Sequence, residues 1–200
     1  MSSLEFWYEF ASPYSYPAAM RIEPRAQALG VRVRWRPFLL GPIFAAQGWT
    51  TSPFVMNPAK GRYMWRDMER LCAAEGLAFQ RPDPFPQSSL LAARLAIALD
   101  ETARPAFTRA VFEAEFVHGR TIGEPEAMAS VLDEFGVDPA PLMAQAQSPD
   151  IKAALKAQGA VAHARGIFGA PTFLTEDGEM FWGFDRMDAA LAWAGAHEAG

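Results

Sequence analysis

The chain has 200 residues, of which 50% are hydrophobic and 20% are charged. This length and composition are typical of one sizeable globular domain, or of two small ones that share a core, and they exclude a disordered or fibrous protein. The net charge of −5 and the lack of any lysine or arginine run argue against nucleic-acid binding.

Targeting and metal-binding signals are weak. No apolar run approaches the ~20 residues that a membrane-spanning helix needs, so we expect no membrane partner. The N-terminus lacks a basic region, and Glu5 and Glu9 interrupt its apolar stretch, which argues against a signal peptide. Cys72 is the one cysteine, which excludes an intramolecular disulfide and a Cys-rich zinc site. We therefore predict a cytoplasmic protein without a metal centre.

The first predicted element is a strand over residues 4–10. Apolar side chains alternate along it, and Leu4, Phe6, Tyr8 and Phe10 share one face. Ser12-Pro13 follows at once.

The Ser12-Pro13 pair is typical of a helix start, with an N-cap residue before a first-turn proline. Backbone N–H groups and the positive end of the helix dipole meet there, so an anion is favoured next to the hydroxyl group. The simpler interpretation is that Ser12 only caps its helix.

A helix over about residues 13–29, ended by Gly30, leads to a second strand over residues 31–36. Pro17 and Pro24 predict a distorted first turn and a kink in the helix. The second strand carries arginines on one face, which is typical of an edge strand. Strand, helix and strand together predict parallel neighbours with a right-handed crossover.

Residues 41–148 contain no strand pattern, and we predict that they form an inserted helical domain. Residues 81–87 hold three prolines and read as a stiff loop within it. Helix starts recur at Asn57-Pro58, Ser88 before Leu90, Arg104-Pro105, Glu124-Pro125 and Asp138-Pro139.

The C-terminal part returns to mixed structure. A helix is predicted from Ser148 to about Arg165, followed by a β-hairpin turning at residues 176–178. The last helix is predicted to start at Asp185, with Asp188 placed as in a capping box.

This order of elements predicts an α/β, thioredoxin-like fold, with a four-stranded mixed sheet and a large all-helical insertion. Residues 1–40 and 149–200 would form the thioredoxin-like domain, interrupted by the helical domain of residues 41–148.

Several motifs carry a family resemblance. Thioredoxin-fold disulfide oxidoreductases have Cys-Pro-x-Cys at the first strand-to-helix turn, where this chain has Ser12-Pro13-Tyr14-Ser15. Over nearly its whole length the chain resembles 2-hydroxychromene-2-carboxylate isomerases, which are close to kappa-class glutathione transferases. The segments that carry this resemblance are FASPYSY (10–16), PAKGRY (58–63), GIFGAPTF (166–173) and FWGFDRM (181–187).

The resemblance implies glutathione as cofactor and Ser12 as the catalytic residue. Without a protein dithiol the chain cannot exchange disulfides, but a serine hydroxyl at a helix N-terminus can donate to a thiolate. The thiol of glutathione should have a pKa near ~8.5, and that position would favour its ionised form. No histidine or lysine lies close in sequence to make Ser12 itself a nucleophile, although a distant base stays open.

The remaining glutathione contacts are also implied by the resemblance. In thioredoxin-like folds the Ala170-Pro171 bond is cis and faces the first helix, which frees the Ala170 backbone to pair with the peptide; the alternative is an ordinary strand-initial proline. Asp185 would pair with the α-ammonium group of glutathione, or cap the last helix, or both. The full predicted set is Ser12, Pro13, Tyr14, Thr50, Ala170, Pro171, Trp182, Gly183, Phe184, Asp185 and Arg186.

An organic substrate would bind beside glutathione. Lys60 and Arg62 would meet its carboxylate or the glycyl end of glutathione; the alternative is a solvated helix face. The other predicted lining residues are Phe44, Gln87, Ser88 and Ser89. Family members often have asparagine near positions 50 and 88, where this chain has threonine and serine.

These features predict a glutathione-dependent isomerase acting on a small aromatic carboxylate. One alternative is a kappa-like glutathione transferase or peroxidase, which would differ only in whether the adduct leaves. Another is a non-catalytic thioredoxin-like binding module. Proteins of this family are often dimers, so a homodimer is allowed and the oligomeric state stays open.

Overall fold

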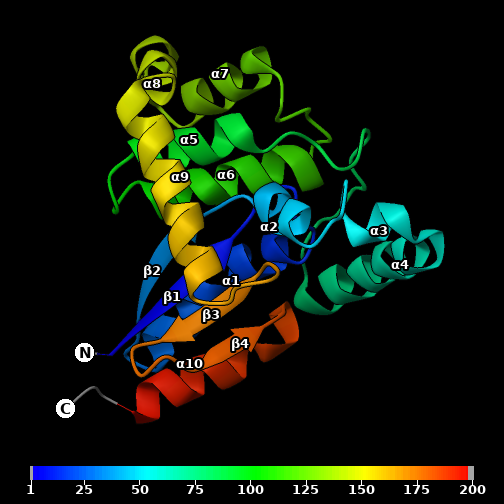
Figure 1. Cartoon of the computed structure of the whole chain (residues 1–200), viewed down its shortest axis with the longest axis vertical. Coiled ribbons are helices and arrows are strands. Elements are labelled where there is room, and N and C mark those ends of the chain that lie inside the picture. Colours follow the sequence, from blue (N-terminus) through cyan, green and yellow to red (C-terminus); the bar gives the residue numbers. More distant parts are fainter. Residues whose placement is uncertain (1, 198–200) are drawn as a thin grey trace.

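Four strands form one mixed sheet, in the order β2-β1-β3-β4, in the computed structural model, which describes residues 2–197 (Figure 1). β1 runs parallel to β2 and antiparallel to β3, and β3 runs antiparallel to β4. The predicted four-stranded mixed sheet is therefore confirmed, with β2 at its edge. The strands are β1 (Ser3–Tyr8), β2 (Arg32–Pro37), β3 (Thr172–Thr175) and β4 (Met180–Trp182).

Aromatic pairs hold the centre of the sheet. Phe6 lies opposite Trp35 on one side and opposite Phe173 on the other. Its ring centroid is 4.9 Å from that of Trp35, in an edge-to-face pair, and 5.4 Å from that of Phe173, in a stacked pair. Such cross-strand aromatic pairs add stability beyond the area that they bury.

The helix α1 (Ser15–Ala28) connects the two parallel strands. Its N-cap residue is Tyr14, which makes no side-chain cap. The predicted helix start at Ser12-Pro13 is therefore wrong, because residues 12–14 form a turn ahead of the helix. In that turn the Ser15 N–H donates to the Ser12 oxygen at 3.0 Å.

Only helices lie between β2 and β3 in the described chain. The predicted helix starts near positions 58, 90, 104, 125, 139 and 149 are confirmed, whereas α2 and α3 were not predicted. α2 has no side-chain cap. α3 begins with a capping Ser52 and a first-turn Pro53, but it is a single turn and too short to give an apolar pattern. The helices are α2 (Leu40–Ala46), α3 (Pro53–Met56), α4 (Pro58–Glu75), α5 (Leu90–Ala98), α6 (Arg104–Phe116), α7 (Pro125–Glu134), α8 (Pro139–Ala146) and α9 (Pro149–Ala164).

The last segment differs from its prediction. A 3-10 turn, η1 (Phe184–Arg186), precedes α10 (Met187–Ala196), and neither element has a side-chain cap. The prediction that Asp185 caps the last helix is therefore wrong, since this residue lies within the 3-10 turn.

Two hydrophobic clusters fix the helices on the sheet. The larger one joins one face of β1 to α1, α10 and the helices α4–α8, so the helical block shares a core with the sheet. The smaller one lies on the other face, under α2 and α9, and consists of Trp7, Phe38, Ile43, Ala162, Ile167 and Leu174, with Ala170 packed against it.

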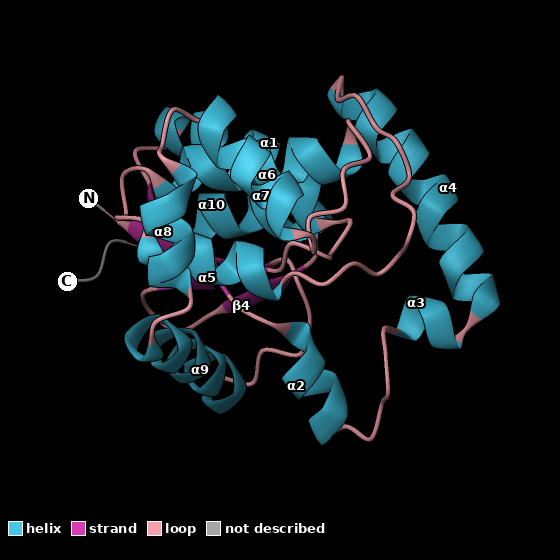
Figure 2. Cartoon of the chain, turned by 90° about the horizontal axis from the view of Figure 1, so that it is seen from above, coloured by secondary structure: helices cyan, strands magenta, loops and turns pink. Residues whose placement is uncertain are grey.

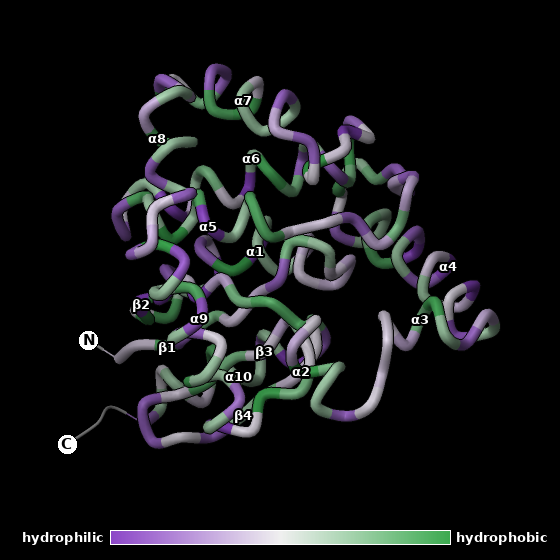
Figure 3. The backbone as a smooth tube through the Cα atoms, turned by 45° about the horizontal axis from the view of Figure 1, so that its top comes forward, coloured by the Kyte–Doolittle hydropathy of each residue, from purple (hydrophilic) through white to green (hydrophobic). Residues whose placement is uncertain are grey.

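Helices α3 and α4 project to one side of the molecule, as the view from above makes clear (Figure 2). α4 buries Met64, Met68 and Cys72 and exposes polar side chains between them. Hydrophobic and hydrophilic residues therefore alternate along this helix (Figure 3). No helix in the described part of the chain has both the length and the apolar character needed to cross a bilayer.

Candidate active site

A serine hydroxyl group lies where β1 gives way to α1. The Oγ of Ser12 donates a hydrogen bond of 2.9 Å to the backbone oxygen of Ala170, and the Ser12 N–H donates to the Glu9 oxygen at 3.0 Å. Only 7% of Ser12 is exposed. The hydroxyl is therefore fixed in direction and lies against the loop that precedes β3.

The Ala170–Pro171 peptide bond is cis and lies within contact distance of Ser12, which confirms both predictions. The Ala170 carbonyl is occupied by the Ser12 hydroxyl, so the expectation that this backbone is wholly free needs correction. Its N–H donates to no other group among residues 2–197. The Pro171 oxygen accepts from the Gly183 N–H at 2.9 Å, which holds the segment after β4 beside the same loop.

The N-terminus of α1 offers fewer free donors than predicted. The N–H groups of Ser15 and Tyr16 are used within the turn, and Pro13 has none. The Tyr14 N–H is without a partner in the described residues. The Ser15 hydroxyl is fully buried and makes no hydrogen bond to any of them.

Tyr14 connects this turn to α4. Its hydroxyl donates to the Asp67 carboxylate at 2.9 Å, and Arg70 donates to the other oxygen of Asp67 at 2.9 Å. Burial, followed by the neighbouring Asp67 carboxylate, raises the pKa of Tyr14 above its ordinary value, so the phenol stays protonated at neutral pH.

An exposed aromatic pair flanks the Ala170 loop. Trp182 is 52% exposed and Phe168 is 47% exposed, and their ring centroids lie 5.0 Å apart in an edge-to-face pair. Gly169 lies against the indole, because a Cβ atom there would come within 2.4 Å of Trp182 Nε1. Further along the chain, Asp185 and Arg186 are exposed and lie 3.5 Å apart as an ion pair.

The predicted substrate-binding cations lie on α4. Lys60 and Arg62 are exposed, and neither forms an ion pair within residues 2–197. Phe44 is half-buried against Trp49, with ring centroids 5.6 Å apart. Thr50 is exposed in the loop after α2. Of these residues, Phe44 is placed on the site's side of the fold, since its helix α2 packs with Ala170 in the smaller cluster.

Two predicted lining residues have their polar groups used inside the protein. The Gln87 amide oxygen accepts from the Ile122 N–H at 2.6 Å, and its nitrogen donates to the Arg120 oxygen at 3.3 Å. The Ser89 hydroxyl donates to the Glu9 carboxyl group. The roles of Gln87 and Ser89 as pocket-lining residues therefore stay a prediction, with their polar groups engaged within the protein, whereas Ser88 is exposed.

Sequence reasoning missed two buried acids close to this turn. Glu9 is 5% exposed and Glu115 is fully buried. Burial raises the pKa of Glu9 to about 7, and burial together with the charge of Glu9 raises that of Glu115 well above its usual range. A signal existed for Glu115, since Val111, Phe112 and Phe116 place it on the apolar stripe of α6.

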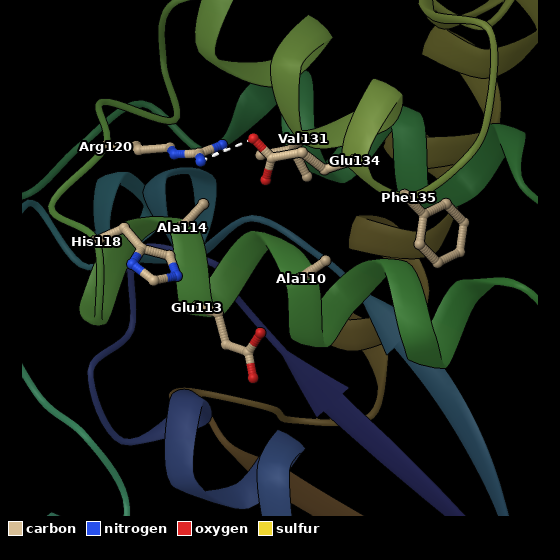
Figure 4. Close-up of a pocket in the computed structure, with 8 residues that line it drawn as sticks. All are labelled: Ala110, Glu113, Ala114, His118, Arg120, Val131, Glu134 and Phe135. Atoms are coloured by element: carbon tan, nitrogen blue, oxygen red, sulfur yellow. Dashed lines mark ion pairs between the residues drawn. The ribbon is translucent and has the colours of Figure 1, made fainter.

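The hollow drawn in Figure 4 lies elsewhere. It encloses about 210 Å³ between α6 and α7, and the ion pair of Arg120 and Glu134, 2.8 Å long, crosses its rim. A second hollow of about 260 Å³ lies beside β2. Neither is lined by Ser12 or Ala170.

Comparison with known proteins agrees with this geometry. A family model described as "DSBA-like thioredoxin domain" matches residues 3–192. A 2-hydroxychromene-2-carboxylate isomerase of Sphingobium xenophagum is 27% identical over 187 residues, covering 93% of this chain and 94% of the relative. One of Pseudomonas putida is 26% identical over 184 residues, covering 92% and 90%.

A solved structure of a 2-hydroxychromene-2-carboxylate isomerase superposes with a TM-score of 0.87 at 25% identity, covering 97% of this chain and 95% of the other. The match therefore extends through the helical block as well as the sheet.

Proposed function

The chain belongs to the DSBA-like thioredoxin domain family, and from this premise we propose that it is a glutathione-dependent isomerase. Its substrate would be an aromatic-catabolism intermediate of the 2-hydroxychromene-2-carboxylate type, converted to a trans-o-hydroxybenzylidenepyruvate. The isomerase names of two relatives that span nearly the whole chain support this reaction class. The observation that carries the proposal is the hydrogen bond from Ser12 to Ala170.

The bond matters because a hydroxyl group has a single proton to donate. A glutathione thiolate bound beside Ser12 would compete with the Ala170 oxygen for that proton. The hydroxyl would turn from the carbonyl to the sulfur, and a charge-assisted bond would replace a neutral one. This exchange stabilises the ionised thiol and lowers its pKa.

The same exchange releases the Ala170 carbonyl. Its oxygen and the unpaired N–H of Ala170 can then bind the cysteinyl backbone of glutathione as a short antiparallel strand. Trp182 and Gly183 lie next to this loop through the bond from Gly183 to Pro171. Asp185 is exposed one turn further on and is suited to the α-ammonium group.

The reaction needs no net oxidation or reduction. The hemiketal ring of the substrate would first open: its C2–O(aryl) bond breaks, the C2 hydroxyl becomes a ketone, and the proton passes to the phenolic oxygen. The thiolate sulfur then adds to the β-carbon of the resulting conjugated enone, and the π electrons move to the carbonyl oxygen to give an enolate. The former double bond rotates as a single bond. The enolate then re-forms the double bond and expels the thiolate, so glutathione is regenerated. Lys60 and Arg62 would hold the substrate carboxylate, and Phe44 and Ser88 would line its ring.

An isomerisation assay with product analysis tests the proposal. Purified protein, substrate and a substoichiometric amount of glutathione should convert many substrate molecules per glutathione, with glutathione recovered intact. A stable glutathione conjugate that accumulates instead would favour the transferase alternative. Absence of turnover at any glutathione concentration, with glutathione bound, would favour the binding-module alternative.

A further inference from the structure

Two carboxyl groups are buried together directly beneath the Ser12 turn. Glu9 ends the segment after β1 and Glu115 lies near the end of α6, in the helical block. Neither carboxyl group has a basic partner among the described residues. Both oxygens of Glu115 are buried without any hydrogen bond in the described chain. Ionising both of these unpaired carboxyl groups would be unfavourable, because each charge would be buried and would repel the other.

The Glu9 carboxyl group is nevertheless held firmly. It accepts a hydrogen bond from the Ser89 hydroxyl, which comes from the segment just before α5, and another from the Ala11 N–H. Ala11 is the residue before Ser12, and the Ser12 N–H is bonded to the Glu9 backbone oxygen. Glu9 therefore holds the turn that carries the Ser12 hydroxyl in two ways, through its side chain at Ala11 and through its backbone oxygen at Ser12.

We propose that Glu9 is a positioning residue for the Ser12 site, and that Glu9 and Glu115 together carry at most one negative charge, which resides on Glu9 and is felt by an anion bound at Ser12. This inference rests on the proposed function for the identity of that anion, a glutathione thiolate. The carboxyl pair then has a role in tuning the site, which the isomerase names of the relatives do not imply.

The distribution of protons follows from the contacts. Glu9 accepts two hydrogen bonds and therefore ionises before Glu115, which has none and faces its charge. Burial raises the pKa of Glu9 to about 7, so near neutral pH the pair alternates between zero and one charge. A thiolate at Ser12 favours the protonated pair, because like charges repel.

The groups that face the pair are few. The Ser89 hydroxyl and the Ala11 N–H face Glu9, and each carboxyl group faces the other. The hydroxyl of Tyr8, from β1, bonds instead to Thr108 of α6 at 2.7 Å, and burial raises its pKa, so it stays neutral. Within residues 2–197, the charge beneath Ser12 is therefore the one that Glu9 carries.

The test is an absorbance titration of the thiolate of bound glutathione, carried out on matched variants. Glu9→Gln removes the charge beneath Ser12 and should lower the pKa of the bound thiol by about one unit. Glu115→Gln replaces a carboxyl group that is still neutral when Glu9 ionises, so it should leave that pKa nearly unchanged. Glu113→Gln, an exposed residue two positions away on α6, should leave it unchanged.

A shift in Glu9→Gln without one in Glu115→Gln distinguishes this role from simple loss of structure, which would move both variants the same way. Equal shifts, or none, in Glu9→Gln and Glu115→Gln would overturn the inference.

A second readout does not depend on glutathione. Infrared difference spectra of the free protein should contain a carboxylic-acid carbonyl band that disappears near neutral pH and is missing in Glu9→Gln. Lack of any such band would overturn the inference even if glutathione is activated. Presence of the band without any thiolate signal in the unmodified protein would instead contradict the proposed function.

Discussion

The hydroxyl group of Ser12 and the backbone oxygen of Ala170, 158 positions apart in sequence, are joined by a hydrogen bond of 2.9 Å. The antiparallel pairing of β1 with β3 brings the two together, since each residue lies just outside its strand. One hydroxyl proton thus stands between a backbone carbonyl and the place where a thiolate would bind.

Removing the hydroxyl should remove thiol activation. Ser12→Ala loses one hydrogen bond to a developing anion, a loss that typically costs roughly 10²-fold or more in rate. Steady-state isomerisation measures the effect on kcat, with binding of glutathione followed by calorimetry. Ser12→Cys should recover little activity, because its thiol would form a mixed disulfide with glutathione. Full activity in Ser12→Ala would contradict the role of Ser12 in activating the thiol.

The loop before β3 should tolerate no side chain at Gly169. A Cβ atom there would approach Trp182 Nε1 to 2.4 Å, so Gly169→Ala must push the indole or the loop aside. We expect the Km for glutathione to rise several-fold, with little change in the free energy of unfolding, because Trp182 is exposed. Gly159→Ala on α9 is the matched control, since its Cβ atom would meet open space. Equal kinetics for the two variants would contradict the account.

Neutralising the cation on α4 should weaken binding of the organic acid. A charge-assisted hydrogen bond contributes about 1.5–3 kcal/mol, so Lys60→Gln should raise the Km for the aromatic carboxylate by roughly tenfold or more. Lys156→Gln on the exposed side of α9 serves as control. Initial rates at varied substrate and saturating glutathione measure the difference. Indistinguishable Km values would indicate that Lys60 only lies on a solvated helix face.

The buried acids should make stability fall as the pH rises. Unfolded glutamates titrate near ~4.3, whereas in the folded protein Glu9 keeps its proton up to about pH 7, and burial together with the charge of Glu9 raises the pKa of Glu115 well above its usual range. The folded state therefore binds more protons in this window. For each extra proton that the folded state binds, the free energy of unfolding falls by about 1.4 kcal/mol with every unit of pH increase.

Denaturant unfolding at a series of pH values, from about 5 to about 8, measures this slope. Glu115→Gln should make it clearly shallower, because glutamine does not titrate and the folded state then no longer holds an extra proton at this position. Glu113→Gln should keep the slope of the unmodified protein. A slope that is the same in all three proteins would contradict the protonation pattern.

Local sequence signals predicted much of the fold. Asn57, Asp138 and Ser148 cap their helices through the backbone N–H groups that the patterns indicated, each contributing about 1 kcal/mol. Ser12 and Asp185 have the same residue types but make no cap. At both positions a turn ahead of the helix takes up the backbone groups, and that depends on tertiary contacts.

The site was predictable where a contiguous motif carries it and less so where distant residues meet. The Ser12 and Ala170 segments each stand out in the sequence, and their contact was expected from the fold. The roles of Ser89 and Glu115 were not, because both depend on how the helical block packs against β1. A glutamate on the apolar stripe of α6 was the available signal for Glu115.

The central claim is that the thiol of glutathione is the working group of the site. The most direct measurement is the isomerisation rate with glutathione, with S-methylglutathione and with neither. The account predicts turnover with glutathione alone, and inhibition of that turnover by S-methylglutathione, which fills the same site without a free thiol. Comparable turnover with S-methylglutathione, or with no added peptide, would contradict it.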